Sequence, residues 1–232
     1  MNIEKINGFW VPSNDVHAEQ WRQGQPFTQN KCLKEFLNWC QGHNQKFNTV
    51  LDIGAWCGTW SAEFAPYCKK IYAIEPDRTH FECLLKNLSS FNNIELLDYA
   101  VGDIETRVSL TDDNFTQAKR IYSIGDILMK TVDSFKFEDV DLIKIDVEGF
   151  ELEVLKGAQN ILKKYKPILI IEFSEDRENA HTSSAEIVDF IRSHARYSLF
   201  KLAGGKERKS KLVEILSYED LPKHDNVICI PL

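Results

Sequence analysis

Short apolar runs of strand length alternate along this chain with segments whose apolar residues recur at helical spacing. Runs of about four to eight apolar residues that end in turn residues are typical of buried strands. The alternation predicts an α/β fold with a mostly parallel sheet and helices on both faces. The expected core strands are Thr49–Ile53, Lys70–Ile74, Ile94–Asp98, Val140–Ile145 and Pro167–Phe173.

Two of the intervening segments give the clearest helix patterns. After the second expected strand, apolar residues fall at helical spacing from Phe81 to Leu88, and Asp77 is placed to cap that helix. After the fourth strand, Val154, Leu155, Ala158, Ile161 and Leu162 predict one continuous helix. Both helices are expected to cover the sheet.

The N-terminal stretch departs from this alternation. Residues 1–46 predict a short lead followed by one amphipathic helix near residues 30–41. Within the lead, Trp10, Asp15, His17 and Trp21 permit two interpretations. They form a flap over an active site, or, in the interpretation that we favour, the aromatic residues only anchor a terminal segment.

Two later stretches also differ from the core pattern. Residues 105–133 predict an inserted hairpin near the mouth of a cleft, with short strands at Arg107–Leu110 and Met129–Val132 around a polar middle. The C-terminal part predicts a helix at 182–194, then strands Tyr197–Leu202 and Asn226–Ile230 flanking a charged loop. The sheet is therefore expected to have seven strands and to end in an antiparallel hairpin.

Composition narrows the class of protein. The 232 residues suffice for one domain with attachments, and the net charge of −7 argues against non-specific binding to nucleic acid or to an anionic membrane. We expect no membrane partner, because no apolar run approaches the length of a membrane span and no signal peptide is visible. The six cysteines form no C-x-x-C pair, which indicates reduced core residues and a cytoplasmic location.

The first candidate for chemistry is the loop after the first strand, Asp52-Ile53-Gly54-Ala55-Trp56-Cys57-Gly58. Gly54 and Gly58 can adopt positive φ and carry no Cβ, so a ligand could lie against the main chain at the start of a helix. The exposed N–H groups favour a carboxylate or a phosphate, and the spacing does not decide between them. A plain strand-to-helix turn would also explain the pattern.

The second candidate is Glu75, which ends the second strand and precedes Pro76. It lies about 20 residues after Gly54, where a carboxylate holds the ribose hydroxyls in a Rossmann-type half. In the alternative interpretation Glu75 merely ends a strand in solvent, which Pro76 would also suit.

Further carboxylates follow the fourth and fifth strands. Asp146 and Glu148 come after Val140–Ile145, and Glu172 lies near the end of the fifth strand. In a doubly wound sheet these residues lie beside the first loop. Unpaired carboxylates are costly there, so we expect them to be used or paired.

These motifs together resemble the FkbM family of S-adenosylmethionine-dependent methyltransferases. The most specific part is the run from Ile143 to Glu151, with Leu155-Lys156-Gly157-Ala158 after it. The resemblance implies a Rossmann-like class I methyltransferase sheet of seven strands. It also implies a cofactor-binding core at 47–173, an N-terminal helical cap at 1–46, and a C-terminal helix and hairpin at 174–232.

The resemblance also implies roles for single residues. Asp52, Gly54, Ala55 and Gly58 would hold the methionine end of S-adenosylmethionine. The Glu75-Pro76 pair would bind its ribose, and the edge formed by Asp98, Ala100 and Val101 would bind its adenine. Asp146 and Glu172 would face the methyl group, and the acceptor would be a hydroxyl on a sugar or another small polyol.

The sequence does not decide which residue is the catalytic base. Asp146 and Glu148 are the first candidates, but the same carboxylates could instead stabilise the cationic cofactor. A divalent metal such as Mg²⁺ on Asp146 and Glu172 is an alternative that we do not expect, because a third ligand is not evident. Of the histidines His80, His181 and His194, only His181 is well placed, just after the fifth strand.

Three other functions compete with this one. An NAD-dependent oxidoreductase or epimerase would share the loop and Glu75, but the G-x-G-x-x-G spacing is missing. A nucleic-acid methyltransferase would share the fold, but the acidic charge opposes it. The third alternative is a binding module that keeps the methyltransferase fold but has lost catalysis.

Overall fold

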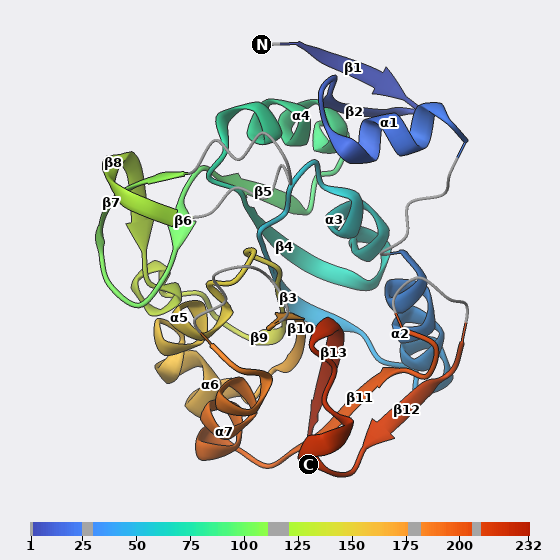
Figure 1. The fold of residues 1–232 in the computed structure, drawn as a ribbon, viewed down its shortest axis with the longest axis vertical. Helices are drawn as coiled ribbons and strands as arrows, with labels where there is room; N and C mark the ends of the chain where they lie inside the picture. Colours follow the sequence, from blue (N-terminus) through green and yellow to red (C-terminus); the bar gives the residue numbers. More distant parts are fainter. Residues whose placement is uncertain (1, 25–29, 111–120, 176–181, 206–209) are drawn as a thin grey trace.

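The core of the protein is one eight-stranded sheet in the order β12-β11-β13-β10-β9-β3-β4-β5 (Figure 1). The computed structural model describes residues 2–24, 30–110, 121–175, 182–205 and 210–232. Five neighbouring strands are parallel. They are β3 (Phe47–Ile53), β4 (Cys68–Ile74), β5 (Ile94–Leu97), β9 (Val140–Ile145) and β10 (Ile168–Ser174).

The other three strands close the sheet on one side. β13 (His224–Pro231) lies antiparallel between β10 and β11 (Tyr197–Leu202), as the expected terminal hairpin requires. The short strand β12 (Leu212–Ile215) adds an antiparallel edge to β11. The predicted sheet is therefore confirmed, and β12 is an eighth strand that the sequence analysis did not predict.

Helices cover both faces of the sheet, as expected (Figure 1). Because side chains alternate along a strand, Leu51 points toward α5 (Glu151–Lys156), α6 (Gln159–Tyr165) and α7 (Ser184–His194). Val50 points toward α2 (Asn30–Gly42) and α3 (Thr59–Phe64), and α4 (Arg78–Leu88) packs on the same side. Each fully buried leucine, isoleucine or phenylalanine contributes about 1.5–3 kcal/mol.

The helix predicted after β9 is in fact two helices. Gly157 separates α5 from α6, and a Cβ there would lie 2.0 Å from the Gly102 carbonyl oxygen. The Asp133 carboxylate then accepts the backbone N–H groups of Asn160 and Ile161 at 2.9 and 3.1 Å. The close backbone contact and this cap from a distant segment divide a helix that periodicity alone would continue.

The lead of the expected N-terminal cap contains a strand hairpin and a short helix that the sequence did not predict. β1 (Ile3–Ile6) and β2 (Phe9–Pro12) form an antiparallel hairpin through Asn7 and Gly8, whose φ values are 52° and 91°. Such paired positive φ values are typical of a tight hairpin turn. A short helix, α1 (Val16–Arg22), follows, and the predicted helix near 30–41 is confirmed as α2.

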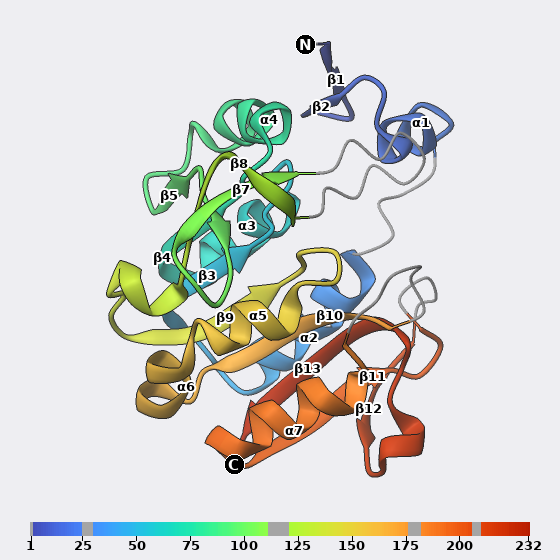
Figure 2. The same ribbon diagram turned by 60° about the vertical axis from the view of Figure 1, so that its left-hand side comes forward.

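The inserted region forms a small separate sheet of β6 (Ala100–Val101), β8 (Ile121–Lys130) and β7 (Thr106–Leu110) (Figure 2). The hairpin is confirmed, but its second strand ends at Lys130. The Thr131 side chain accepts the Ser134 N–H, and this bond starts the short helix η2 (Val132–Phe135) where the sequence predicted a strand. The polar stretch 112–114 lies outside the described residues.

Two further expectations can be checked. All six cysteines are free thiols, and five of them are buried. Within the described ranges, none of the helices has both the length and the apolar composition needed to span a bilayer.

Candidate functional site

The loop from Gly54 to Gly58 connects β3 to α3 with the backbone that the sequence predicted. Gly54 and Gly58 have φ values of +74° and +88°. A Cβ on Gly54 would lie 1.9 Å from the Asp146 carbonyl oxygen, and a Cβ on Gly58 would lie 2.8 Å from Leu84 Cδ1. At both positions the missing side chain therefore leaves room for a protein neighbour.

Glu75 lies at the centre of the loop's polar contacts. It is buried, and its Oε2 accepts the Trp56 backbone N–H at 2.9 Å while its Oε1 accepts the Asp77 N–H at 2.9 Å. Pro76 is half-buried between these contacts. Glu75 therefore faces the glycine loop, and the alternative of a strand end in solvent is wrong.

A buried histidine that the sequence analysis did not assign to this position supports Glu75. His80 Nδ1 lies 3.7 Å from both Glu75 Oε1 and Asp77 Oδ1, and its Nε2 lies 3.9 Å from Asp15 Oδ2. Burial lowers the pKa of His80, but the interaction with Glu75 and the charges of Asp77 and Asp15 outweigh it, so the pKa is raised. The carboxylates around the loop therefore favour the protonated form of His80.

The N-terminal segment packs against the glycine loop. The Trp56 indole Nε1 donates to Asp15 Oδ2 at 3.2 Å, and the rings of His17 and Trp21 lie 5.3 and 6.0 Å from the Trp56 ring. Trp10 is joined to the loop through Asn87, whose side chain binds the Trp10 backbone N–H and carbonyl and also donates to the Cys57 carbonyl at 2.8 Å. All four residues considered for a flap are thus brought to the loop, Trp10 by way of Asn87.

A buried lysine joins the loop to β9, and the sequence analysis missed it. Lys144 Nζ donates to the Gly54 carbonyl at 2.6 Å and lies 3.1 Å from Asp52 Oδ1 and 3.8 Å from Asp146 Oδ2. Burial lowers the pKa of Lys144, but Asp52 and Asp146 outweigh this effect, and the pKa is raised. A charged residue inside an apolar strand was the available sequence signal.

Asp52 is enclosed by these protein groups. It is buried, and besides Lys144 it accepts the Ser61 hydroxyl at 2.6 Å. Ala55, the other loop residue that the sequence analysis assigned to the cofactor, is also buried. The Asp52 carboxylate thus fixes Lys144 and α3 in place.

Three carboxylates meet beside the loop, as the strand order predicted. Asp146, Glu148 and Glu172 each offer an oxygen within 4.8 Å of the others. The Asp146 N–H donates to the Ile53 carbonyl at 3.1 Å, which confirms that this cluster adjoins the end of β3. His224 Nε2 lies 3.6 Å from Glu172 Oε1.

The backbone that presents Glu148 is unusual. Glu148 has φ +63°, a conformation that costs a non-glycine residue about 1–2 kcal/mol. The buried Glu151 holds this loop, because its Oε1 accepts the N–H groups of Val147 and Gly149 at 3.3 and 3.0 Å. Burial raises the pKa of Glu151 to about 7.

The three residues expected to bind adenine do not share one exposed edge. Asp98 is exposed and follows Leu97, whose carbonyl accepts the Glu75 N–H at 3.0 Å. Ala100 and Val101 belong to β6, and both side chains are buried against protein. Of this set, Asp98 alone presents an exposed side chain near Glu75.

Of the three histidines considered as bases, the two that the structure describes, His80 and His194, lie apart from the carboxylate cluster. His194 lies on α7, where its Nδ1 is 2.9 Å from the Phe190 carbonyl oxygen. His181 lies outside the described residues. His80 contacts Glu75 and Asp15, so it is not placed as a base beside Asp146.

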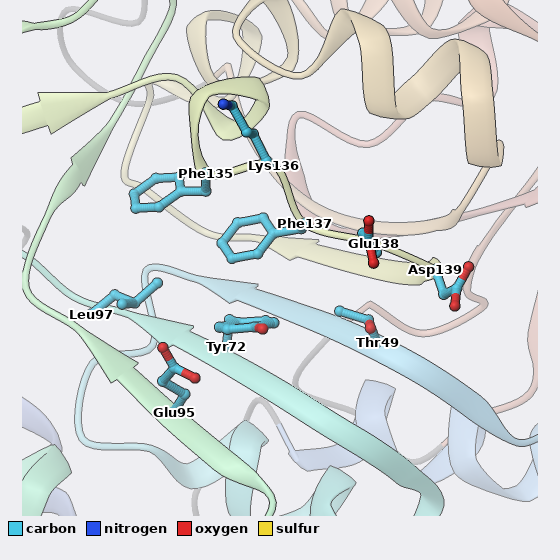
Figure 3. Close-up of a pocket in the computed structure, with 9 residues that line it drawn as sticks. All are labelled: Thr49, Tyr72, Glu95, Leu97, Phe135, Lys136, Phe137, Glu138 and Asp139. Atoms are coloured by element: carbon cyan, nitrogen blue, oxygen red, sulfur yellow. The ribbon is translucent and has the colours of Figure 1, made fainter.

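A cavity of about 440 Å³ lies elsewhere on the sheet (Figure 3). Tyr72 lines it, and the Phe137 ring packs 4.4 Å from the Tyr72 ring. Tyr72 is the register partner of Leu51, whereas Asp52 pairs with Ala73 and points to the other face. The cavity is therefore separate from the site described above.

Comparison with known proteins identifies the family. The Methyltransferase FkbM domain matches residues 48–199, well over half of the chain. The hexuronic acid methyltransferase AglP of Haloferax volcanii is 27% identical over 134 residues, which are 53% of this chain and 55% of that protein. This chain thus spans about half the length of that relative.

A solved structure supports the fold. Methyltransferase FkbM from Methylobacillus flagellatus matches with a TM-score of 0.54 at 19% identity, over 79% of this chain and 44% of the other. The family match also favours a methyltransferase over the alternative of an NAD-dependent oxidoreductase or epimerase. This chain belongs to the FkbM family of S-adenosylmethionine-dependent methyltransferases.

Proposed function

We propose that this protein transfers a methyl group from S-adenosylmethionine to a hydroxyl of a sugar or another small polyol. The observation that carries the proposal is the cluster of Asp146, Glu148 and Glu172 beside the glycine loop. The sugar-like acceptor is supported by the related hexuronic acid methyltransferase, which matches about half of each chain.

The residues of the loop fit the cofactor chemically. In this proposal the Glu75 carboxylate accepts hydrogen bonds from the ribose hydroxyls, because two backbone N–H groups already hold it in a fixed orientation. Asp98 is the exposed polar group next to it on the adenine side. Gly54, Ala55 and Gly58 shape the turn that carries the methionine end, and Asp52 acts on that turn through Lys144.

Bound S-adenosylmethionine supplies a methyl group that is already activated as a sulfonium. The protein then has to align the acceptor oxygen and receive its proton. Alignment accounts for about 7–11 kcal/mol of the barrier in favourable cases, and a positioned base adds a factor of about 10² to 10⁴. Asp146 and Glu148 are the proposed bases, and Glu172 helps to hold the acceptor.

Cofactor binding is the first test. Isothermal titration with S-adenosylhomocysteine should show micromolar binding that Glu75→Ala weakens by about 100-fold, while NADH should not bind. Circular dichroism would show that the variant is folded. Failure of folded wild-type protein to bind S-adenosylhomocysteine would overturn the proposal.

Methyl transfer is the second test. Radiolabelled S-adenosylmethionine would be offered with a panel of sugars, uronic acids and polyols, and Asp146→Asn is expected to remove the activity. If the cofactor binds but no acceptor is methylated, the binding module without catalysis becomes the better description.

A further inference from the structure

A feature that the methyl transfer leaves unexplained is the close approach of three carboxylates, those of Asp146, Glu148 and Glu172, at the carboxyl ends of β9 and β10. Lys144 Nζ lies near Asp146 and Asp52, and His224 Nε2 lies 3.6 Å from Glu172 Oε1. The Lys144 ammonium is held by Asp52 and by the Gly54 carbonyl, and it approaches Asp146 only from one side. Each of these carboxylates offers an oxygen within 4.8 Å of the others, and a cation bound between them would reduce their mutual repulsion.

A second, independent group lies beside Glu172. Asn226 on β13 is the register partner of Glu172 on β10, so the two side chains share one face of the sheet. Asn226 is only 2% exposed, and its Nδ2 has no hydrogen-bond partner among the described residues. A buried amide without a partner is uncommon, and the amide can present its oxygen to the same place by a half-turn about its last bond.

We propose that Asp146, Glu148, Glu172 and Asn226 bind a divalent cation of the magnesium or manganese class. All four offer hard oxygen ligands, which such cations prefer. The sequence alone offered two ligands, Asp146 and Glu172, on adjacent strand ends. The structure adds Glu148 and Asn226 as further candidate ligands. Four protein ligands leave open positions for water or for hydroxyl groups of the acceptor.

The role of this cation follows from its place next to the methyl donor, and this role, unlike the binding itself, rests on the proposed function. A bound cation lowers the pKa of a coordinated hydroxyl, so the acceptor would lose its proton to a neighbouring carboxylate. The oxygen electron pair then forms the new O–C bond. The S–C bond of the sulfonium breaks, and its electron pair stays on sulfur as a neutral thioether.

The test measures the metal directly. Mn²⁺ would be titrated calorimetrically into EDTA-treated, dialysed full-length protein, and the number of bound ions confirmed by electron paramagnetic resonance. One site is expected in the wild type, weakened about 10-fold or more by Glu172→Gln and by Asn226→Ala. The matched control is Glu214→Gln, an exposed glutamate on β12, which should bind Mn²⁺ as the wild type does.

The melting temperature measured without metal shows whether the variant is folded. Glu172→Gln should leave this melting temperature unchanged or raise it, because the substitution removes repulsion between carboxylates. Mn²⁺ should then raise the melting temperature of the wild type but not of this variant. Binding of S-adenosylhomocysteine, measured separately, distinguishes failure of this proposal from failure of the proposed function.

Two results would overturn the metal site. One is Mn²⁺ binding that is equal in the wild type and in Glu172→Gln, which would indicate scattered surface carboxylates. The other is a folded protein that binds S-adenosylmethionine but no Mn²⁺, since the cluster would then serve the sulfonium alone.

Discussion

The Trp56 backbone N–H donates to Glu75 Oε2 at 2.9 Å and thereby joins the glycine loop to the end of the neighbouring strand. The other oxygen of Glu75 is held by the Asp77 N–H at the start of α4. One carboxylate therefore fixes the loop, the strand end and the helix start relative to one another. A ligand that contacts Glu75 meets groups that are already in place.

The first prediction concerns this carboxylate. Glu75→Gln keeps one acceptor oxygen, so we expect it to weaken S-adenosylhomocysteine binding by about 10-fold, and Glu75→Ala by about 100-fold, because hydrogen bonds to a charged group contribute about 1.5–3 kcal/mol. Isothermal titration measures both. Glu95→Ala, which removes an exposed ion pair with Lys70, is the control and should bind normally.

The second prediction concerns Lys144. Lys144→Met would leave Asp52 buried without its cation, and we expect the free energy of unfolding in urea to fall by about 3–5 kcal/mol. Asp52→Asn in the same chain should restore part of that loss. Lys70→Met, in an exposed pair, should cost no more than about 1 kcal/mol. Equal losses for the two lysine variants would contradict this account of the buried ion pair.

The third prediction concerns pH. The pKa of His80 in the folded protein is raised above its ordinary value of 6.5, so the protonated form stabilises the fold. That contribution is fully present below the unfolded-state pKa and disappears as the pH rises through the folded-state pKa. The stability advantage of the wild type over His80→Gln in urea unfolding should be larger at about pH 5.5 than at about pH 9. A difference that does not change with pH would show that folding leaves the pKa of His80 unshifted.

The fourth prediction concerns Gly54. Gly54→Ala puts a methyl group into the Asp146 carbonyl and strains a positive φ, so we expect a loss of about 2–5 kcal/mol in unfolding free energy and weakened cofactor binding. Gly42→Ala, in α2 with no atom within 4 Å of the new Cβ, should be neutral or slightly stabilising. Thermal and urea unfolding compare the two variants.

Much of the architecture was determined by local patterns. The apolar runs became β3, β4, β5, β9 and β10, and Asp77 caps α4 as its position predicts, accepting the N–H groups of Thr79 and His80. The positive φ of Gly54 and Gly58 also followed from residue type. The N-terminal hairpin also has a local signal, because Asn7-Gly8 is a favoured two-residue turn.

The tertiary structure decided which of these elements meet. Lys144 is explained only when β9 pairs with β3, which puts its ammonium beside Asp52. Asn226 becomes a candidate ligand only because it is the register partner of Glu172, which lies 54 residues earlier in the chain. Gly157 ends α5 because the distant Gly102 carbonyl lies against it. Periodicity and residue type act over a few neighbouring residues, whereas ion pairs, caps and ligand sets depend on contacts between strands that only the folded chain brings together.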